Sequence, residues 1–576
     1  MKIVIALAQI NPTVGALRKN ADRIVDRART AAKEGASVVV FPELALSGYP
    51  PEDLVLKKHF LEDCWHELEG MADQLPPESL IMVGAPQMVD TQVYNAAVIY
   101  HAGRMVTTYQ KMILPNYGVF DEKRVFAPGK MPLILQAGTA RIAIHICEDS
   151  WYPDEDTVLL LKESRIDLLV NLSASPYHRG KRVLRETTLR KTGEQLHSAF
   201  AYCNIVGGQD ELVFDGGSLV MDQTGTLLAR ARQFEEDLLF AEVTVSDIPT
   251  VVDEPSPPSR RTVHIPFHPS VRRSERAPRS SVTPLLDDQT EVYEALKTGL
   301  RDYTEKNGFK KTVVALSGGI DSALVAVLAV DTLGADRVAG ITMPSQYTST
   351  ETLTDAELLA QNLGIEFHTI PIRAIHGTFL TELLPFWEGW PPDITEENLQ
   401  ARIRGNIIMA LSNKFGWLVL TTGNKSELAT GYCTLYGDMV GGFSLMKDVP
   451  KTLVYELSEW RNRQGPSPVI PLSTIERPPT AELRPDQKDT DSLPPYAVLD
   501  AIIERYVEQD QGVDRIVAEG FDPDTVRQVS RLIDLSEYKR RQGAPGIKIT
   551  PKAFGRDRRM PITNAYRERV KGADLT

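Results

Sequence analysis

The stretch Thr312–Ala329, TVVALSGGIDSALVAVLA, decides the fold of the second half of this 576-residue chain. Its first residues, Thr312–Leu316, are apolar and rich in β-branched side chains, which predicts a buried strand. The pattern breaks at the Ser-Gly-Gly of residues 317–319, and an apolar stretch at helical spacing begins after Asp321. A strand, a glycine turn and a helix together aim backbone N–H groups and a helix N-terminus at a phosphate. We therefore expect an anion site at this turn.

Two hydroxyls and a carboxylate accompany the glycines of this turn. Ser317 and Ser322 add donors, and Asp321 is a hard oxygen ligand suited to Mg²⁺. The chain contains no GxxxxGK[ST] pattern, so this is not a Walker-type loop. A lone Ser-Gly-Gly more often only closes a strand–helix unit. The longer run SGGIDS, however, resembles the signature of the PP-loop ATP pyrophosphatases, which cleave ATP between its α and β phosphates and adenylate an acceptor.

Length and composition narrow the class of protein. A chain of 576 residues predicts about two to four domains. A net charge of −13 gives no general basic surface for nucleic acid, although a local basic pocket for a nucleotide remains compatible with it. The four cysteines (Cys64, Cys147, Cys203 and Cys433) show no metal-site spacing, which favours a reducing compartment and no structural zinc. Without a signal peptide or an apolar stretch long enough to span a bilayer, we expect a cytoplasmic protein with no membrane partner.

Strand and helix patterns alternate through residues 1–245, which we assign to a first domain. KIVIALAQI predicts a strand and Leu17–Glu34 an amphipathic helix. Further strand patterns are SVVVFPE, LIMVGAPQ, AAVIYHAG, RMVTTYQK, ARIAIHIC and DLLVNLSA. GGSLVMDQTGTLLAR predicts a hairpin that turns at residues 223–225.

A change of composition separates two domains. Residues 246–284 are dominated by proline, arginine and serine, which predicts a linker or a surface wrap, extended rather than helical. A solvated tether is favoured, and contact of its arginines with a partner subunit is the alternative. A second α/β domain, residues 285–576, begins with a helix leading into the glycine turn. Asn398–Phe415 predicts another helix, and WLVLTTGNKSE predicts a strand that runs into a loop. The segment Arg477–Pro495 is proline-rich and acidic, too polar for a core, and is expected to order over a ligand.

Three residues of the first domain follow predicted strands, where α/β folds collect catalytic groups: Glu43, Lys111 and Cys147. Cys147 would be the nucleophile, with a neighbouring cation that favours the thiolate. Glu43 would act as general base and then as acid to departing ammonia. Lys111 and the backbone N–H of Glu148 would stabilise the oxyanion. Each residue alone is more often an inert core cysteine or a solvated charge.

In their local sequences FPELALSGYP, YQKMILPNYGVFDE and HICEDSW, these residues match the Glu-Lys-Cys triad of the nitrilase (carbon–nitrogen hydrolase) superfamily. The resemblance covers essentially all of residues 1–245. It implies an αββα sandwich that pairs into dimers and hydrolyses amides or nitriles through a thioester or thioimidate.

The block YQKMILPNYGVFDEKRVF looks like the glutaminase domain of glutamine-dependent NAD⁺ synthetases, and NLSASPYHRGK resembles their substrate segment. The implied glutamine-binding residues are Tyr49, Tyr117, Glu122, Ser175 and Lys181. An acidic acceptor for the α-ammonium together with serine and lysine donors for the carboxylate suits glutamine. Lys181 lies beside two arginines, and a surface cation is the alternative for it.

SGGIDS together with ENLQARIRGN, TTGNKSE, KDVPKTLVY and RPPTAELRP resembles the NAD⁺ synthetase family over nearly the whole second domain. The resemblance implies a doubly wound parallel sheet and ATP-dependent amidation of deamido-NAD⁺ (nicotinic acid adenine dinucleotide). The dinucleotide carboxylate attacks the α-phosphate of ATP, pyrophosphate leaves, and ammonia displaces AMP.

The same resemblance implies a set of ligand contacts. ATP would meet Leu316, Ser317, Gly318, Gly319, Ile320, Asp321, Ser322, Ala323, Thr422 and Lys447. Deamido-NAD⁺ would meet Asn398, Arg402, Glu427 and Lys552. Asp321 and Glu427 would hold Mg²⁺, which prefers oxygen ligands and keeps several waters. Asn398 and Arg402 are four residues apart and share a helix face, as residues of a merely solvated face also do.

A glutaminase joined to a ligase predicts an enclosed path for ammonia, because ammonium in neutral water is not nucleophilic. The long linker predicts that an oligomer completes this path, and the resemblance implies a homo-oligomer, often an octamer. The alternatives are another PP-loop amidotransferase or a catalytically spent nucleotide-binding scaffold. GMP synthetases carry a Cys-His-Glu glutaminase, so the Glu-Lys-Cys set disfavours the first. The intact triad and Asp321 disfavour the second.

Overall fold

The computed structural model describes residues 1–246, 260–267, 281–387, 389–485, 487, 489–566 and 568. It divides into two compact units: residues 1–209 with 213–286, and residues 210–212 with 287–576. The predicted linker sequences EPSPPSRR and RRSERAPRSS lie largely outside the described residues. Within the described part of the chain, no helix is long and apolar enough to cross a membrane.

Two sheets form the centre of the first unit. One has the strand order β14-β1-β2-β3-β4-β5 and the other β13-β12-β9-β8-β7-β6-β15. The strands of the first sheet are β1 (Lys2–Gln9), β2 (Val38–Val40), β3 (Leu80–Val89), β4 (Gln92–His101), β5 (Arg104–Gln110) and β14 (Asp237–Thr244). Those of the second are β6 (Leu133–Ala137), β7 (Ala140–Ile146), β8 (Leu168–Ser173), β9 (Ala199–Asn204), β12 (Leu219–Met221), β13 (Leu227–Arg230) and β15 (Arg261–Ile265). A separate hairpin consists of β10 (Val206–Gln209) and β11 (Leu212–Asp215).

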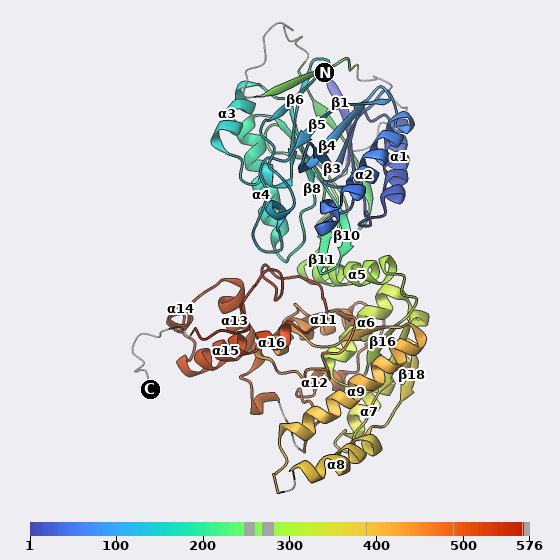
Figure 1. The fold of residues 1–576 in the computed structure, drawn as a ribbon, viewed down its shortest axis with the longest axis vertical. Helices are drawn as coiled ribbons and strands as arrows, with labels where there is room; N and C mark the ends of the chain where they lie inside the picture. Colours follow the sequence, from blue (N-terminus) through green and yellow to red (C-terminus); the bar gives the residue numbers. More distant parts are fainter. Residues whose placement is uncertain are drawn as a thin grey trace. The chain divides into compact units, whose positions relative to one another are not determined.

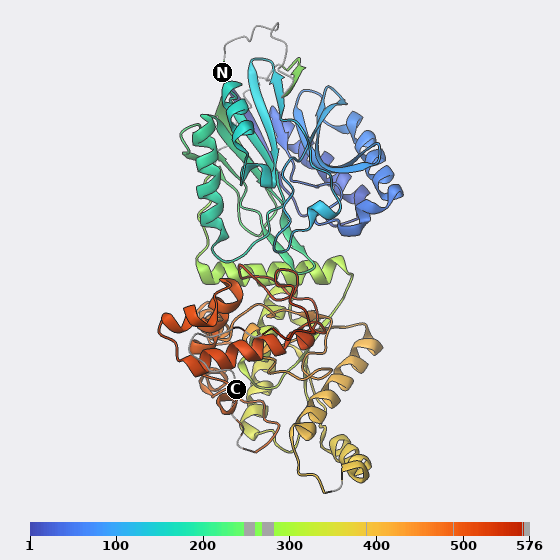
Figure 2. The ribbon, with the colours of Figure 1, turned by 60° about the vertical axis from the view of Figure 1, so that its left-hand side comes forward.

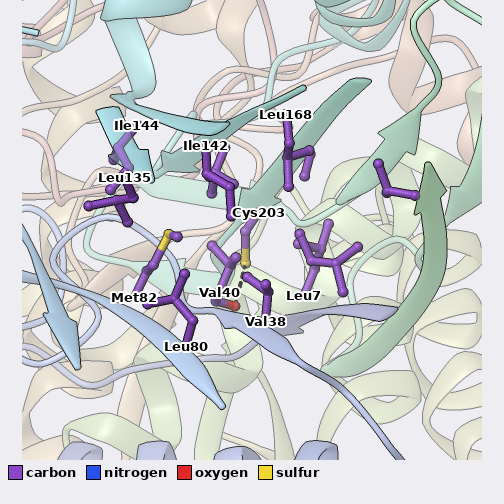
Figure 3. Packing of buried hydrophobic residues seen from close by; sticks show 14 of the residues in the cluster. Leu7, Val38, Val40, Leu80, Met82, Leu135, Ile142, Ile144, Leu168 and Cys203 are labelled. Carbon is purple, nitrogen blue, oxygen red and sulfur yellow. Dashed lines mark hydrogen bonds between the residues drawn. The ribbon is translucent and has the colours of Figure 1, made fainter. Parts of the chain in front are cut away.

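The two sheets pack face to face through alternate apolar side chains. Figure 3 shows Leu7, Val38 and Leu80 of one sheet facing side chains of the other, such as Leu168. Cys203 lies among them, and its thiol donates to the carbonyl oxygen of Val40 at 3.3 Å. Burial of apolar side chains on both inner faces is the main stabilising contribution to a sandwich of this kind.

Helices cover the outer faces of the sandwich (Figure 1). The helices on one side are α1 (Leu17–Lys33) and α2 (Lys58–Met71), and those on the other are α3 (Glu155–Glu163) and α4 (Lys181–Leu196). Buried Ala21, Ile24, Val25 and Ala28 of α1 repeat at helical spacing, which explains the amphipathic pattern in the sequence. The αββα architecture is confirmed.

The edges of the sandwich extend beyond the first predicted domain. Strand β14 pairs antiparallel with β1 over its whole length, from Lys2 with Thr244 to Gln9 with Asp237. Strand β15 pairs parallel with β6, and Phe267 just after it is buried. The prediction of a solvated tether is therefore wrong at residues 261–265. The strand-forming residues Thr262, Val263 and Ile265 were not recognised in the sequence because arginines and prolines surround them.

A parallel sheet with the strand order β18-β17-β16-β19-β20 forms the centre of the second unit. Its strands are β16 (Thr312–Ala315), β17 (Val338–Thr342), β18 (Glu366–Thr369), β19 (Leu418–Thr421) and β20 (Phe443–Ser444). The helices of the unit are α5 (Asp288–Lys306), α6 (Ile320–Leu333), α7 (Thr350–Leu363), α8 (Arg373–Trp387), α9 (Ile394–Phe415), α10 (Lys425–Thr430), α11 (Lys451–Arg463), α12 (Leu472–Glu476), α13 (Tyr496–Ile503), α14 (Val513–Ala518), α15 (Pro523–Leu535) and α16 (Glu537–Arg540). The doubly wound parallel sheet is confirmed.

The strand order reverses between β16 and β19, and the glycine turn follows β16 at that point. Ligands of open α/β sheets bind outside the carboxyl ends of strands where the order reverses. Helix α6 begins at Ile320 and is buried along most of its length, which explains its continuous apolar sequence.

Two segments of the second unit differ from their sequence predictions. The expected loop after β19 contains α10, which Asn424 caps through the backbone N–H of Glu427. Asn and Glu at this spacing form a capping box, so the sequence carried a helix signal. In the polar segment 477–495, Asp489 and Leu493 are nevertheless buried. Leu493 joins the apolar cluster formed mainly by α13, α14 and α15.

Candidate active sites

The predicted triad of the first unit comes from both sheets. Glu43 follows β2, Lys111 follows β5, and Cys147 opens a short 3-10 turn, Cys147–Ser150, after β7. Lys111 Nζ donates to Glu43 Oε1 at 2.7 Å. The other carboxylate oxygen of Glu43 accepts the backbone N–H of Ala174 at 2.8 Å. All three triad side chains are buried, so the structure brings them together in one water-poor site.

Glu122 is the second carboxylate on Lys111. Its two oxygens lie 2.9 and 2.8 Å from Lys111 Nζ, and Oε1 also accepts the Tyr49 hydroxyl at 2.9 Å. Glu122 and Tyr49 were both predicted to bind glutamine. The structure places both side chains in the interior, Glu122 on Lys111 and Tyr49 on Glu122.

Burial sets the electrostatics of the nucleophile. It raises the pKa of the Cys147 thiol well above its ordinary value, and the charge of Glu43 raises it further, while Lys111 opposes both. Burial likewise works against the charge of Lys111, but Glu122 and Glu43 outweigh it and hold the Lys111 pKa well above normal. Lys111 thus lowers the pKa of the Cys147 thiol, in the direction expected from the sequence, but burial and Glu43 outweigh it. The resting thiol is therefore protonated and needs a base.

The backbone at Cys147 adopts the left-handed conformation, with φ of 43°. Asn171 Nδ2 donates to the carbonyl oxygen of Cys147 at 3.1 Å and to Ser150 Oγ at 2.6 Å. Non-glycine residues in this conformation are uncommon and depend on surrounding contacts. The turn thus holds Cys147 in a fixed and unusual orientation.

Two of the remaining predicted glutamine ligands, Tyr117 and Lys181, contact the turn or the residue just after it. Tyr117, about half exposed, donates to Glu148 Oε1 at 2.9 Å. Ser175 is buried, and its backbone N–H donates to Asn204 Oδ1 at 2.9 Å. Lys181 donates to the Pro176 carbonyl oxygen at 2.9 Å. Its ammonium also lies 5.7 Å from the centre of the Trp151 ring.

In the second unit, the glycine turn has the geometry of an anion cradle. Gly318 has φ of 81°, and a Cβ added there would lie 2.2 Å from the Thr352 carbonyl oxygen, so only glycine fits. Ser317 Oγ and Ser322 Oγ lie 3.1 Å apart. The side chains of Leu316, Ile320 and Ala323 are buried, and the backbone N–H groups of Leu316 and Ala323 donate to the carbonyl oxygens of Ile341 at 2.8 Å and Gly319 at 3.1 Å.

The two predicted metal ligands share one cation, which comes from a residue that the sequence reasoning missed. Lys451 Nζ forms an ion pair with Asp321 and lies 3.7 Å from Glu427 Oε1. Asn424 Nδ2 donates to the other oxygen of Asp321 at 2.8 Å. Burial, with the charge of Asp321, raises the pKa of Glu427 to about 8. Lys451 belongs to the block KDVPKTLVY, from which Lys447 was the residue predicted to contact ATP.

The donor set of Asp321 and Glu427 fits Mg²⁺, since two carboxylate oxygens from different segments already face one cation. Among the residues described, no group of three histidine, cysteine, aspartate or glutamate side chains forms a complete metal site. Mg²⁺ commonly takes one or two carboxylates and completes its shell with phosphate and water, so two ligands suffice.

Two other predicted contacts, Glu427 and Lys447, line one pocket in the second unit. Lys447 Nζ donates to the Ala544 carbonyl oxygen at 2.8 Å. Thr422 follows β19, the neighbour of β16 at the glycine-turn edge of the sheet.

The three remaining predicted dinucleotide contacts lie on α9 and near the C-terminus. Asn398 Oδ1 accepts the Thr434 hydroxyl at 2.8 Å, and Arg402 Nε donates to the Leu435 carbonyl oxygen at 3.2 Å. These two α9 residues therefore face one segment. Lys552 is bound instead to the Asp510 carboxylate, at 2.5 and 2.6 Å.

Comparisons with known proteins match a different family in each half of the chain. Residues 4–251 match the carbon-nitrogen hydrolase family and residues 292–543 match the NAD synthase family. The chain is 47% identical to the glutamine-dependent NAD(+) synthetase of Thermotoga maritima, over 98% of this chain and 99% of that protein. It is 43% identical to the synthetase of the same name from Acinetobacter baylyi, over 98% of both chains.

A solved structure also aligns along nearly the whole length. The glutamine-dependent NAD⁺ synthetase of Acinetobacter baumannii, in complex with ADP, has a TM-score of 0.74 and 41% sequence identity. The alignment covers 98% of this chain and 99% of that one. Both family matches thus occur in one chain whose relatives align along nearly its whole length. This chain belongs to the family of glutamine-dependent NAD⁺ synthetases.

Proposed function

We propose that this ligase amidates deamido-NAD⁺ to NAD⁺ with ATP, using ammonia that its first unit releases from glutamine. Residues 1–245 act as the glutaminase, 285–576 as the synthetase, and 246–284 connect them. The products are AMP, pyrophosphate and glutamate. The observation that carries the proposal is the buried Glu43–Lys111–Glu122 network beside Cys147 in the same chain as the Asp321–Lys451–Glu427 cluster.

In the first reaction, Glu43 accepts the proton of the Cys147 thiol, which burial keeps protonated at rest. The thiolate attacks the side-chain amide carbon of glutamine. Lys111 and the backbone N–H of Glu148 stabilise the oxyanion that forms. Glu43 then gives its proton to the departing ammonia, and water hydrolyses the thioester to glutamate.

In the second reaction, the carboxylate of deamido-NAD⁺ attacks the α-phosphorus of ATP and pyrophosphate leaves. The backbone N–H groups of residues 317–319, with Ser322, hold the phosphates, and Lys451 meets their charge. Mg²⁺, when bound at Asp321 and Glu427, supplies further charge neutralisation at the phosphates. Ammonia then attacks the acyl adenylate carbon, AMP leaves, and the amide of NAD⁺ is formed. Catalysis here depends mainly on positioning and charge.

The two activities are coupled in our proposal, with ammonia passing between the sites through an enclosed path. Coupling prevents glutamine hydrolysis when no acceptor is bound. We expect slow glutaminase turnover without deamido-NAD⁺; equal rates with and without it would contradict the coupling.

An exposed apolar cluster supports self-association, and we propose a homo-oligomer, an octamer by resemblance to the family. The cluster lies on α8, in the loop after it and at the start of α9, in the gold segment at the lower right of Figure 2, and α8 and α9 pack against each other. Phe386 and Trp390 are 83% and 80% exposed, and Leu384 and Ile394 are exposed beside them in sequence. Large exposed apolar groups of this kind mark interaction surfaces. Light scattering of Phe386→Glu should show a smaller particle than wild type, and an unchanged mass would exclude this face.

We also propose a cytoplasmic location. Cys64, Cys147, Cys203 and Cys433 are all free thiols, which supports a reducing compartment. Partition of the tagged protein between cytosolic and membrane fractions tests this assignment.

One experiment tests the proposed function directly. Wild type and Cys147→Ala are incubated with ATP, Mg²⁺ and deamido-NAD⁺, with either glutamine or ammonium as nitrogen source, and NAD⁺ and AMP are measured. We expect Cys147→Ala to keep ammonium-driven synthesis and to lose glutamine-driven synthesis. Failure of wild type to form AMP with either nitrogen source would overturn the proposed function.

A further inference from the structure

We propose that Asp149 is a positioning residue for glutamine hydrolysis, because its carboxylate fixes the backbone that carries Lys111 against the backbone that carries Cys147. The inference rests on the proposed function, in which Cys147 is the nucleophile and Lys111 stabilises the oxyanion.

One carboxylate receives four donors from the two catalytic segments. Asp149 Oδ1 accepts the backbone N–H groups of Met112 at 3.1 Å and Ile113 at 2.8 Å. Oδ2 accepts the backbone N–H of Ile146 and the hydroxyl of Tyr109, each at 2.9 Å. Three of these donors flank Lys111 in sequence, and the fourth belongs to the residue just before Cys147.

These hydrogen bonds cross between the two sheets of the sandwich. Tyr109 belongs to β5, at the edge of one sheet, and Ile146 ends β7 in the other. The contacts between the sheets are otherwise mainly apolar, and apolar packing is not directional. Hydrogen bonds to a charged acceptor are directional and stronger than neutral ones. Asp149 therefore determines how the end of β5 lies against the end of β7.

The other residues of the turn make different contacts. Glu148 accepts the hydroxyl of Tyr117, and Ser150 interacts with Asn171 and with His145 Nδ1. Asp149, in contrast, reaches the segment of Lys111. The turn thus separates two tasks: Ser150 and Asn171 orient the nucleophile, and Asp149 sets its distance from the catalytic cation.

The environment of Asp149 shows why a charged group is suited to this task. Asp149 is buried, and burial raises its pKa to about 6, although the N–H groups of Ile146 and Ile113 oppose the shift. A buried carboxylate is unfavourable unless its oxygens are satisfied, and here four donors satisfy them. Asparagine would keep one acceptor oxygen but would turn an NH₂ group toward two donors. Buried ionisable residues whose pKa is shifted by desolvation are typical of functional sites.

The test measures the reactivity of the thiol as well as catalysis. Wild type and Asp149→Asn are alkylated with iodoacetamide over a range of pH, and peptide mass spectrometry follows Cys147. Glutaminase kcat and KM are measured on the same preparations. We expect Asp149→Asn to lower kcat roughly 100-fold, as a misplacement of about 1 Å does, with little change in the KM for glutamine. The pH profile of Cys147 alkylation in Asp149→Asn should also shift relative to that of wild type.

A matched control separates positioning from stability. Asp154→Ala removes the cap of α3, where Asp154 Oδ1 accepts the backbone N–H of Thr157. It should lower the melting temperature and leave Cys147 alkylation unchanged. Ammonium-driven NAD⁺ synthesis should be normal in both variants, because the second unit is untouched.

The outcomes distinguish this inference from the proposed function. If Asp149→Asn has the same kcat and the same pH profile of Cys147 alkylation as wild type, the positioning role is overturned and the proposed function is not. Glutamine-driven synthesis that survives Cys147→Ala would instead overturn the proposed function. If Asp149→Asn does not fold, Tyr109→Phe removes a single donor, and the role then requires slower alkylation; an unchanged rate in Tyr109→Phe overturns it.

Discussion

Lys451 forms a partly buried ion pair with Asp321, although the two residues are 130 positions apart in the chain. The pair places an ammonium group beside the glycine turn and between the two predicted metal ligands. We expect Lys451→Met to lower ammonium-driven NAD⁺ synthesis about 100-fold or more, the usual effect of losing a charge-stabilising donor. Steady-state AMP formation measures this effect.

The control for that experiment is Lys447→Met. Lys447 is the lysine chosen from the sequence, but it donates to the Ala544 carbonyl oxygen in this structure. Its replacement should have the smaller effect. If Lys447→Met loses more ammonium-driven NAD⁺ synthesis than Lys451→Met, Lys447 is the residue that contacts the phosphates. Cys147 alkylation should be equal in both variants.

Glu122 distinguishes two interpretations of the glutaminase site through kinetics. Because Glu122 binds Lys111 with both oxygens, Glu122→Gln should weaken oxyanion stabilisation and lower kcat about 100-fold. KM for glutamine should stay within about threefold. If Glu122 held the substrate ammonium instead, KM would rise and kcat would be retained. Initial rates of glutamate release over a range of glutamine concentrations decide between the two.

Gly318 and Gly319 form a matched pair for testing the turn. Gly318 has φ of 81° and no room for a Cβ, whereas a Cβ at Gly319 would meet Ser317 Oγ at 3.4 Å, an ordinary contact. Gly318→Ala should destabilise the second unit by more than about 1 kcal/mol and abolish NAD⁺ synthesis. Gly319→Ala should be clearly milder. Thermal unfolding and ammonium-driven synthesis measure the two effects, and equal behaviour of the variants would contradict the cradle geometry.

His145 gives the first unit a predictable sensitivity to acid. Burial lowers its pKa to about 4 from the usual 6.5, so below pH 6.5 the unfolded chain binds a proton that the folded chain does not. Stability therefore falls as pH falls, by about 2 kcal/mol between pH 6.5 and pH 5. Urea unfolding, followed through the exposure of buried Cys203 to dithiodipyridine, measures the loss. His145→Gln should lose less stability over this interval, and parallel losses would contradict the assignment.

Local sequence was sufficient to predict the parts of the fold that depend on neighbours in the chain. The run 312–329 gave its strand, turn and helix because β-branched residues, glycines and helical apolar spacing follow one another directly. Glu43, Lys111 and Cys147 were predicted for the same reason, since each lies in a distinctive local motif.

Partnerships between distant segments could not be predicted in this way. Lys451 pairs with Asp321 only because α11 and α6 pack together, and two lysines four residues apart look alike in sequence. Glu122 was read as a substrate ligand because its pairing with Lys111 depends on the fold of the intervening loop. Strand β15 was missed because edge pairing depends on a partner strand more than on composition.

The pairing of β1 with β14 has a consequence during translation. Strand β1 leaves the ribosome long before β14, its neighbour on one side, which comes from residues 237–244. Until those residues emerge, β1 presents an open edge to other nascent chains on the same polysome. Premature termination before residue 237 would therefore release a fragment prone to aggregation, whereas termination after the closing strand would leave this edge protected.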